Sequence, residues 1–186
     1  MIVGPFGAGK TAMISTISGD PVVGTEVPTT GVEAKQKAST TVGLEYGVLQ
    51  MATEHFDIDL LLYGTPGQER FRFMWDAAAI GADGFVVLVD ATDPDTWDSA
   101  AEALAYVQAS HAAKSVVAAN RATARSKELI RVSKQLDLVV PNDIPVVACD
   151  VTDNESMRVV LIALLDRILL NEDEAIAREG ELSHAK

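Results

Sequence analysis

The sequence predicts an α/β protein with a single domain, in which a mostly parallel sheet of about six strands carries helices on both faces. Segments rich in β-branched residues alternate with Ala- and Leu-rich segments, which is typical of this class. The segment 84–90 is almost uniformly apolar, as expected of a central parallel strand. A glycine-rich loop at residues 4–11 lies between a short apolar segment and an amphipathic one. With 186 residues, the chain is most simply one domain.

The first half of the chain is expected to contain one helix and an antiparallel pair of strands. A short strand at 2–3 precedes the glycine-rich loop, and a helix at 10–18 follows it and ends at a Gly-Asp-Pro turn. The polar, threonine-rich segment 22–41 has little periodicity and is expected to be a long functional loop. Strands at 42–51 and 56–63 are joined so tightly that they must run antiparallel, which makes one of them an edge strand.

In the second half, strands alternate with helices. The strands are expected at 84–90, 115–119 and 144–149, and the helices at 95–111, 125–138 and 154–171. The domain is expected to span residues 1–172, followed by a polar, acidic tail at 173–186 that frays from the last helix. A buried strand normally has about 5–6 residues. The first strand is therefore expected to be short or clipped, unless the natural start lies upstream.

Composition and charge exclude several classes of function. The net charge of −12 argues against contact with nucleic acid or an anionic membrane, because both need clustered Lys and Arg. The single cysteine, Cys149, excludes an internal disulfide and fits a reducing compartment. No apolar run reaches transmembrane length, no prenylation motif is present, and the glycine-rich loop leaves no room for a signal peptide. We therefore expect a cytoplasmic protein without an intrinsic membrane anchor.

The glycine-rich loop has the spacing Gly-x-x-x-x-Gly-Lys-Thr of a phosphate-binding loop, which predicts a P-loop NTPase fold. Its glycines let successive backbone N–H groups point at phosphate oxygens, Lys10 reaches the β- and γ-phosphates, and the Thr11 hydroxyl binds Mg²⁺. A chance glycine-rich turn is the alternative, but four fixed positions should match by accident in only about one chain in a hundred. Nine consecutive residues are therefore expected to contact the nucleotide: Gly4, Pro5, Phe6, Gly7, Ala8, Gly9, Lys10, Thr11 and Ala12.

A second motif, Gly-Thr-Pro-Gly-Gln-Glu-Arg-Phe, begins at Gly64, where the third predicted strand ends. The Gly67 N–H can bind the γ-phosphate there, and the Gln68 amide can orient an attacking water. This motif resembles the second switch of the Ras-like small GTPases, which has the form Asp-x-x-Gly-Gln. The run Thr-Val-Gly-Leu-Glu-Tyr from Thr41 is similar to their first switch, which implies that Thr41 binds Mg²⁺ and senses the γ-phosphate.

A narrower resemblance covers most of the chain. The second motif, the Phe-Met-Trp-Asp run at 73–76 and the apolar strand at 84–90 are similar to the bacterial conservon-type GTPases, relatives of the bacterial polarity GTPases. This resemblance implies protein effectors and regulators as partners, among them a roadblock-type protein and a sensor-kinase-like protein.

Two departures from the Ras-like pattern concern the metal and the base. Gly64 stands where most Ras-like proteins have the aspartate that holds Mg²⁺ through water, so coordination is expected to depend on Thr11 and Thr41 with phosphate oxygens and waters. Asp57 and Asp59, earlier on that strand, are expected to face solvent. The guanine-reading motif is present only in part, from Asn120 to a threonine at position 123.

That threonine replaces a carboxylate with a poorer, uncharged acceptor, at a cost of about 1.5–3 kcal/mol for one charge-assisted contact. The resemblance favours GTP or GDP as the ligand, with ATP or relaxed specificity left open. Residues expected on the base side are Asn120, Arg121, Cys149, Asp150 and Val151. Cys149 is also interpreted as a small buried residue.

A third departure concerns catalysis, because no arginine precedes Arg70. Without an arginine finger, intrinsic hydrolysis is expected to be slower by about 10³–10⁵-fold. Arg70 and Arg72 are interpreted mainly as surface partners of nearby acids. Trp75 and Trp97 are expected in the core as helical aromatics, although the cluster 71–75 beside the second motif is also a candidate effector surface.

The sequence thus predicts a GTP-binding molecular switch with slow, partner-dependent hydrolysis. Gln68, Lys10 and Gly67 are the catalytic candidates, and Thr11 and Thr41 are the metal candidates. Two alternatives remain open at this stage: a nucleotide-dependent scaffold that scarcely hydrolyses, and a small-molecule kinase using the same phosphate loop. The chain offers no Arg-rich lid of the kind that such a kinase needs.

Overall fold

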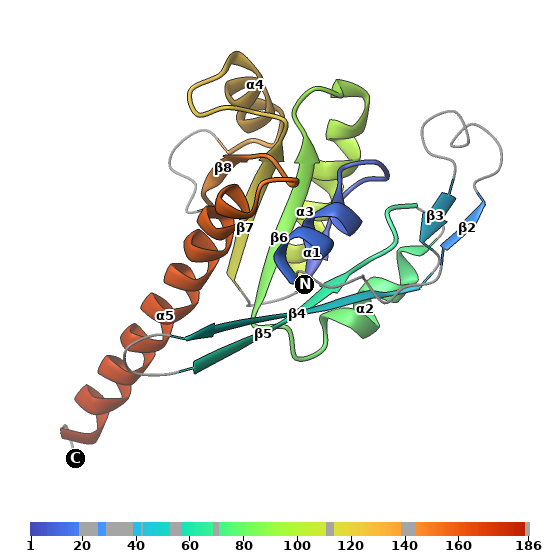
Figure 1. Cartoon of the computed structure of the whole chain (residues 1–186). Helices are drawn as coiled ribbons and strands as arrows, with labels where there is room; N and C mark the ends of the chain where they lie inside the picture. The colour runs from blue at the N-terminus through green and yellow to red at the C-terminus, as the bar shows by residue number, and fades with distance from the viewer. Residues whose placement is uncertain are drawn as a thin grey trace.

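The computed structural model describes residues 1–18, 26–28, 39–41, 43–52, 57–68, 71–110, 114–138 and 144–184, and the side chains of 26–28, 39–41, 52, 110 and 170–184 lie outside that description. Its elements alternate along the chain as the composition predicts (Figure 1). They are β1 (Ile2–Val3), α1 (Lys10–Ser18), β2 (Glu26–Pro28), β3 (Ser39–Thr41), β4 (Glu45–Ala52), β5 (Asp57–Gly64), α2 (Phe73–Ala79), β6 (Gly84–Asp90), the 3₁₀ helix η3 (Pro94–Thr96), α3 (Trp97–Ser110), β7 (Lys114–Asn120), α4 (Lys127–Gln135), β8 (Val146–Cys149) and α5 (Asn154–His184).

A six-stranded sheet in the order β4-β5-β1-β6-β7-β8 forms the centre of the molecule. Only the β4–β5 pair within it is antiparallel, and it puts β4 at one edge (Figure 1). The two-residue strand β1 lies in the middle, where Ile2 is paired with Gly64 on one side and Val86 on the other. The predicted fold class is therefore confirmed, and the glycine-rich loop leaves the carboxyl end of a central strand.

The two faces of the sheet are covered by different helices. Along β6, Phe85, Val87 and Val89 join a core cluster with side chains of α2, α3 and α4. The alternate residues Val86 and Leu88 join a second cluster with α1 and α5. Every residue of β6 is buried, which explains its almost unbroken apolar sequence. Helices therefore pack on both faces, as predicted.

Two segments differ most from the sequence prediction. Part of the expected loop at 22–41 forms a small antiparallel sheet, in which Val27 of β2 is paired with Thr40 of β3. Helix α5 continues to His184, well beyond residue 171. Its added segment has four Glu and two Ala, whose high helix propensity favours continuing the helix into the acidic segment that the sequence predicted as a fraying tail. Within the described ranges, no helix is long and apolar enough to cross a membrane.

Candidate functional site

The phosphate loop connects β1 to α1 and is shaped by three glycines with positive φ: Gly4 at 144°, Gly7 at 82° and Gly9 at 109°. A Cβ at Gly4 would overlap the carbonyl oxygen of Leu88 on β6, so only glycine lets the chain leave the sheet so close to its neighbour. A Cβ at Gly9 would come within 2.9 Å of the Asn120 side-chain nitrogen. The loop is therefore packed tightly against the carboxyl ends of the sheet.

Lys10 begins α1 and curls back over the loop. Its ammonium group donates to the carbonyl oxygens of Gly4 and Pro5, both at 2.8 Å, and the side chain is buried. These two hydrogen bonds hold the only cation of the loop at its centre, close to the amino-terminal end of α1. Positive charge, backbone N–H groups and a helix amino terminus together favour a phosphate group here.

A hydrogen bond from Thr11 places Glu45 in the site, a residue that the sequence did not indicate. The Thr11 hydroxyl donates to the carboxylate of Glu45, the first residue of β4, which is 2% exposed. In the sequence, Glu45 belongs to the run from Thr41 that resembles a first switch, and no motif marks it further. Its position beside Thr11 depends on the β4–β5 register, in which Glu45 is paired with Gly64, and no local sequence signal fixes that register.

The second motif lies directly against the phosphate loop. A Cβ at Gly67 would lie 2.5 Å from the Lys10 Nζ and 2.8 Å from the Phe6 main-chain nitrogen. Thr65 anchors this segment, since its N–H donates to the Ile2 carbonyl at 3.1 Å. Gln68 is 2% exposed, so its amide is enclosed at the edge of the site. Lys10 and Gly67, two of the catalytic candidates, are thus brought together.

Thr41 ends β3, where its backbone is paired with Glu26. Its side chain lies outside the described residues, as does Arg70 after the second motif. The metal and γ-phosphate roles of Thr41 therefore stay predictions. Asp57 and Asp59 are both exposed on β5, as expected of solvent-facing strand residues.

Asn120, at the carboxyl end of β7, links three parts of the site through one side-chain amide. Its nitrogen donates to the Ala8 carbonyl at 3.0 Å, and its oxygen accepts from the backbone N–H groups of Arg121 at 2.9 Å and Val151 at 3.2 Å. The amide is buried, so these bonds are shielded from water. Asn120 therefore fixes the phosphate loop to the loop after β8, on which two of the other base-side candidates, Asp150 and Val151, lie.

Arg121 and Asp150 lie on the rim around Asn120. The Arg121 guanidinium forms an ion pair with the carboxylate of Asp90, the last residue of β6. Asp150 accepts from the hydroxyl and N–H of Thr152, and these hydrogen bonds, followed by the charge of Arg121, lower the pKa of the Asp150 carboxyl. Thr123 is exposed nearby. The rim therefore has two carboxylates, Asp90 and Asp150, but none at position 123.

Cys149 is buried at the end of β8, as the sequence predicts for a small core residue. Burial, reinforced by the nearby charge of Asp150, raises the pKa of its thiol to about 12. Because the thiolate is the reactive form, we expect the native protein to resist alkylation by iodoacetamide at pH 8. Mass spectrometry should find one alkylated cysteine only after denaturation, and rapid labelling of the native protein would contradict this environment.

The cluster at 71–75 divides into a buried part and an exposed part. Trp75 is buried in the core beside Tyr106, so its inclusion in a candidate effector surface was wrong, whereas the expectation of a core position for Trp75 and Trp97 is confirmed. Phe73 is 72% exposed, because the helical period of α2 turns it away from the core. Arg72 pairs with Glu102 on α3, as predicted for a surface arginine.

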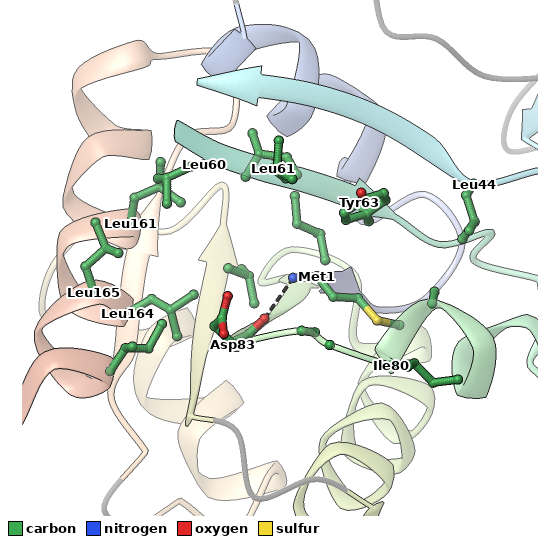
Figure 2. A pocket seen from close by; sticks show the side chains of 18 of the residues that line it. Met1, Leu44, Leu60, Leu61, Tyr63, Ile80, Asp83, Leu161, Leu164 and Leu165 are labelled. Atoms are coloured by element: carbon green, nitrogen blue, oxygen red, sulfur yellow. Dashed lines mark hydrogen bonds between the residues drawn. The ribbon is translucent and has the colours of Figure 1, made fainter. Parts of the chain in front are cut away.

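A cavity of about 480 Å³ lies at the other end of the sheet, near the amino ends of β1 and β6 (Figure 2). It is lined mainly by apolar side chains, including Leu60 of β5 and Leu164 of α5. The Met1 amino group donates to the Gly84 carbonyl at 2.8 Å, and burial lowers its pKa to about 6 against the opposing charge of Asp83. This cavity is separate from the phosphate loop, which follows the carboxyl end of β1.

Comparison with known proteins agrees with this geometry. Residues 1–170 match the sequence profile of the Ras family. The chain is 19% identical to GTP-binding protein ypt1 of Schizosaccharomyces pombe over 170 residues, which cover 90% of this chain and 78% of that protein. It is 29% identical to Ras-related protein Rab-1D of Dictyostelium discoideum over 97 residues (52% and 42%). It is 23% identical to Ras-related protein RABD2a of Arabidopsis thaliana over 107 residues (58% and 47%).

The chain thus spans less than half the length of the latter two relatives, whereas the family match extends over nearly all of its own length. The phosphate loop, the second motif and the six strands of the central sheet all lie within the matched residues. The chain belongs to the Ras family.

Proposed function

We propose that this chain is a GTP-binding molecular switch that hydrolyses GTP slowly and depends on a protein partner for speed. The observation that carries the proposal is the contact between the second motif and the phosphate loop, where Gly67 lies against Lys10 and Phe6. A phosphate held by Lys10 would meet the Gly67 segment directly. Loss of the γ-phosphate would therefore remove a contact from that segment and change its conformation, together with that of helix α2, which follows it.

Each candidate residue has a separate task in this switch. Lys10 neutralises charge on the β- and γ-phosphates, the Gly67 N–H binds the γ-phosphate, and Gln68 orients the attacking water. Thr11 and Thr41 are proposed as metal-binding residues, with Thr41 closing over the γ-phosphate. Asn120 and Arg121 hold the base together with the loop of Cys149, Asp150 and Val151.

Mg²⁺ fits the donors that the structure places beside the phosphate loop. The Thr11 hydroxyl and the Glu45 carboxylate are both hard oxygen ligands of the kind that Mg²⁺ prefers. The described part of the chain contains no group of three or more His, Cys, Asp or Glu side chains suited to a metal, so the ion would be held jointly with the nucleotide. Mg²⁺ held there would supply positive charge that offsets the negative charge of the phosphates.

GTP is proposed over ATP on the strength of the family, although Thr123 offers the base no carboxylate. A competition assay decides this, in which unlabelled GDP and ADP displace a fluorescent guanine nucleotide from the protein. Displacement by GDP at much lower concentrations supports the proposal. Equal displacement by ADP would mean that position 123 has relaxed the specificity, as the scaffold alternative allows.

Protein partners are proposed to dock beside the second motif. Tyr46 and Tyr63 form a tilted aromatic pair on the outer surface of β4 and β5, with ring centroids 5.4 Å apart. Phe73 and Ile80, at the two ends of α2, are 72% and 83% exposed. Large exposed apolar side chains are typical anchors of protein interfaces. The resemblance to conservon-type GTPases nominates a roadblock-type protein and a sensor-kinase-like protein, with the switch acting in the cytoplasm.

Replacing Gln68 with leucine is expected to slow GTP hydrolysis by about tenfold or more, because the attacking water loses its orientation. Phosphate release in a single turnover, with and without a candidate partner, measures this. GDP binding should stay intact. The matched control is Gln50→Leu on β4, an exposed glutamine bonded to Asp59 at 3.1 Å, which should hydrolyse like the wild type.

The outcomes separate the switch from its rivals. If the wild type binds GTP but shows no turnover with any candidate partner, it is a nucleotide-dependent scaffold. If Gln68→Leu retains full phosphoryl transfer to a small acceptor, the chain is a kinase.

A further inference from the structure

Three neighbouring parallel strands, β6, β7 and β8, end at the same edge of the sheet, on the base side of the site. Asn120 at the end of β7 is paired with Asp90 of β6 and with Cys149 of β8. Asp150 follows Cys149 directly, so a carboxylate stands on each side of Asn120. Either of the two is therefore a candidate to contact a base held beside the Asn120 amide.

Guanine and adenine differ in what they present to such a carboxylate. Guanine has two adjacent donors, its N1–H and its N2 amino group, whereas adenine has a bare acceptor nitrogen at N1. An ionised carboxylate only accepts hydrogen bonds, so it stabilises guanine by a charge-assisted contact and repels the N1 lone pair of adenine. Because Thr123 has no carboxylate, this selectivity requires one from another residue.

Both oxygens of Asp90 are already engaged within the protein. Its Oδ1 accepts from the N–H of Thr92 at 2.9 Å and from the Thr92 hydroxyl at 2.7 Å. Its Oδ2 forms the ion pair with Arg121, and the residue is only 5% exposed. Asp90 therefore holds Arg121 in place and does not face a ligand.

Asp150 forms the same turn but keeps one oxygen open. The sequence Asp-x-Thr-Asp occurs at the ends of both β6 and β8, and Oδ1 of Asp150 likewise accepts from the N–H of Thr152 at 2.9 Å and from its hydroxyl at 2.7 Å. No residue in the described part of the chain donates to the other oxygen, Oδ2. The hydrogen bonds from Thr152 lower the pKa of this exposed carboxyl, so it is ionised at neutral pH. Asp150 therefore presents one open, charged acceptor on the rim.

Two backbone contacts fix Asp150 beside the Asn120 amide. Its own N–H donates to Oγ of Ser156 at 2.9 Å, which ties it to the first turn of α5. The next residue, Val151, donates its N–H to Oδ1 of Asn120 at 3.2 Å. Main chain and side chain are thus both held before a ligand binds, which lowers the entropic cost of a contact made through Oδ2.

We propose that Asp150 selects guanine in this chain, in place of the carboxylate that position 123 lacks. Its Oδ2 accepts from the N1–H and the N2 amino group of guanine, and adenine is disfavoured because its N1 lone pair would face the same oxygen. The inference rests on the proposed nucleotide binding and names a specificity-determining residue for that site.

The test is to measure the affinities for GDP, ADP and xanthosine diphosphate by isothermal titration calorimetry. Asp150→Asn keeps an oxygen for Thr152 but puts an N–H₂ donor in place of Oδ2. Its affinity for GDP should fall by about 10–100-fold, the loss of one charge-assisted contact. Its affinity for xanthosine diphosphate should rise above that of the wild type, because xanthine has a carbonyl oxygen where guanine has its N2 amino group. Asp57→Asn, which removes an exposed carboxylate at the start of β5, is the matched control and should bind like the wild type.

A second variant covers the case in which Asp150→Asn fails to fold, as judged by its thermal melting. Asp150→Ser retains a small polar side chain that supports a similar turn but carries no charge. It should lose the preference for GDP over ADP.

Wild-type affinities in a folded variant would overturn the inference and leave the proposed nucleotide binding intact. A fall in GDP affinity in Asp150→Asn with no gain for xanthosine diphosphate would also overturn it, because a merely structural role predicts that result. Equal affinity of the wild type for GDP and ADP would do the same, since no selectivity would then exist. Failure of the wild type to bind any nucleotide would instead overturn the proposed function.

Discussion

Replacing Lys10 with methionine is expected to weaken nucleotide binding by about 100-fold or more, because a charge-assisted hydrogen bond to phosphate is worth about 1.5–3 kcal/mol and Lys10 can form several. The ammonium group already lies at the centre of the loop, bonded to Gly4 and Pro5 at 2.8 Å. Methionine retains the length and apolar character of the side chain but removes the charge and all three donors.

Fluorescence titration with a labelled GDP analogue measures the loss. Lys134→Met, an exposed lysine in the last turn of α4, is the matched control and should bind like the wild type. Wild-type affinity in Lys10→Met would show that the nucleotide is bound elsewhere.

The second large effect is on stability. Gly4→Ala is expected to lower the free energy of unfolding by about 3 kcal/mol or more, because it combines a strained backbone with a clash against main chain. The φ of Gly4 is 144°, which L-residues rarely adopt, and the new Cβ would overlap the Leu88 carbonyl oxygen. That oxygen belongs to the central strand β6, so it has no room to move away.

Urea unfolding, without nucleotide, measures the change. Gly81→Ala is the control for backbone strain alone, since its φ is 77° and a Cβ there would meet nothing within 4 Å. Its cost should be about 1 kcal/mol. Equal costs for the two variants would mean that the loop and β6 can separate without penalty.

The segments that could be predicted from the sequence carry local signals. Helix α1 and strand β6 have the predicted bounds. The sequence Gly-Asp-Pro after residue 18 predicts the end of the helix, and an unbroken apolar run predicts the strand. The β2–β3 sheet was missed, since Val27 and Thr40 lie in polar segments without period-two alternation. Helix α5 was predicted too short, because the prediction relied on apolar periodicity and gave no weight to the helix propensity of the residues that follow.

The same division holds for the candidate site. The phosphate loop was found from spacing alone, because each of its positions is fixed by contact with phosphate. Glu45 was not recognised, because its role depends on a cross-strand partner, Gly64, and on a helix residue, Thr11. Trp75 was expected in the core but was also included in the candidate effector surface, and the phase of α2, which turns it inward, decides between the two. A single sequence does not show which residues are paired across the sheet, and the position of Glu45 depends on that pairing.

The position of β1 has a consequence for how the protein folds. This strand is the centre of the sheet, yet its partners lie far along the chain: Ile2 accepts from Thr65 across 63 residues, and Met1 donates to Gly84 across 83. Contacts of such long sequence separation form slowly, because the entropy of closing the intervening chain is lost before they contribute. During synthesis on a ribosome, β1 therefore cannot complete its pairing in the sheet until β6 has been made. The phosphate loop follows β1 without a break, so nucleotide binding becomes possible only after β6, which ends at Asp90, has been synthesised.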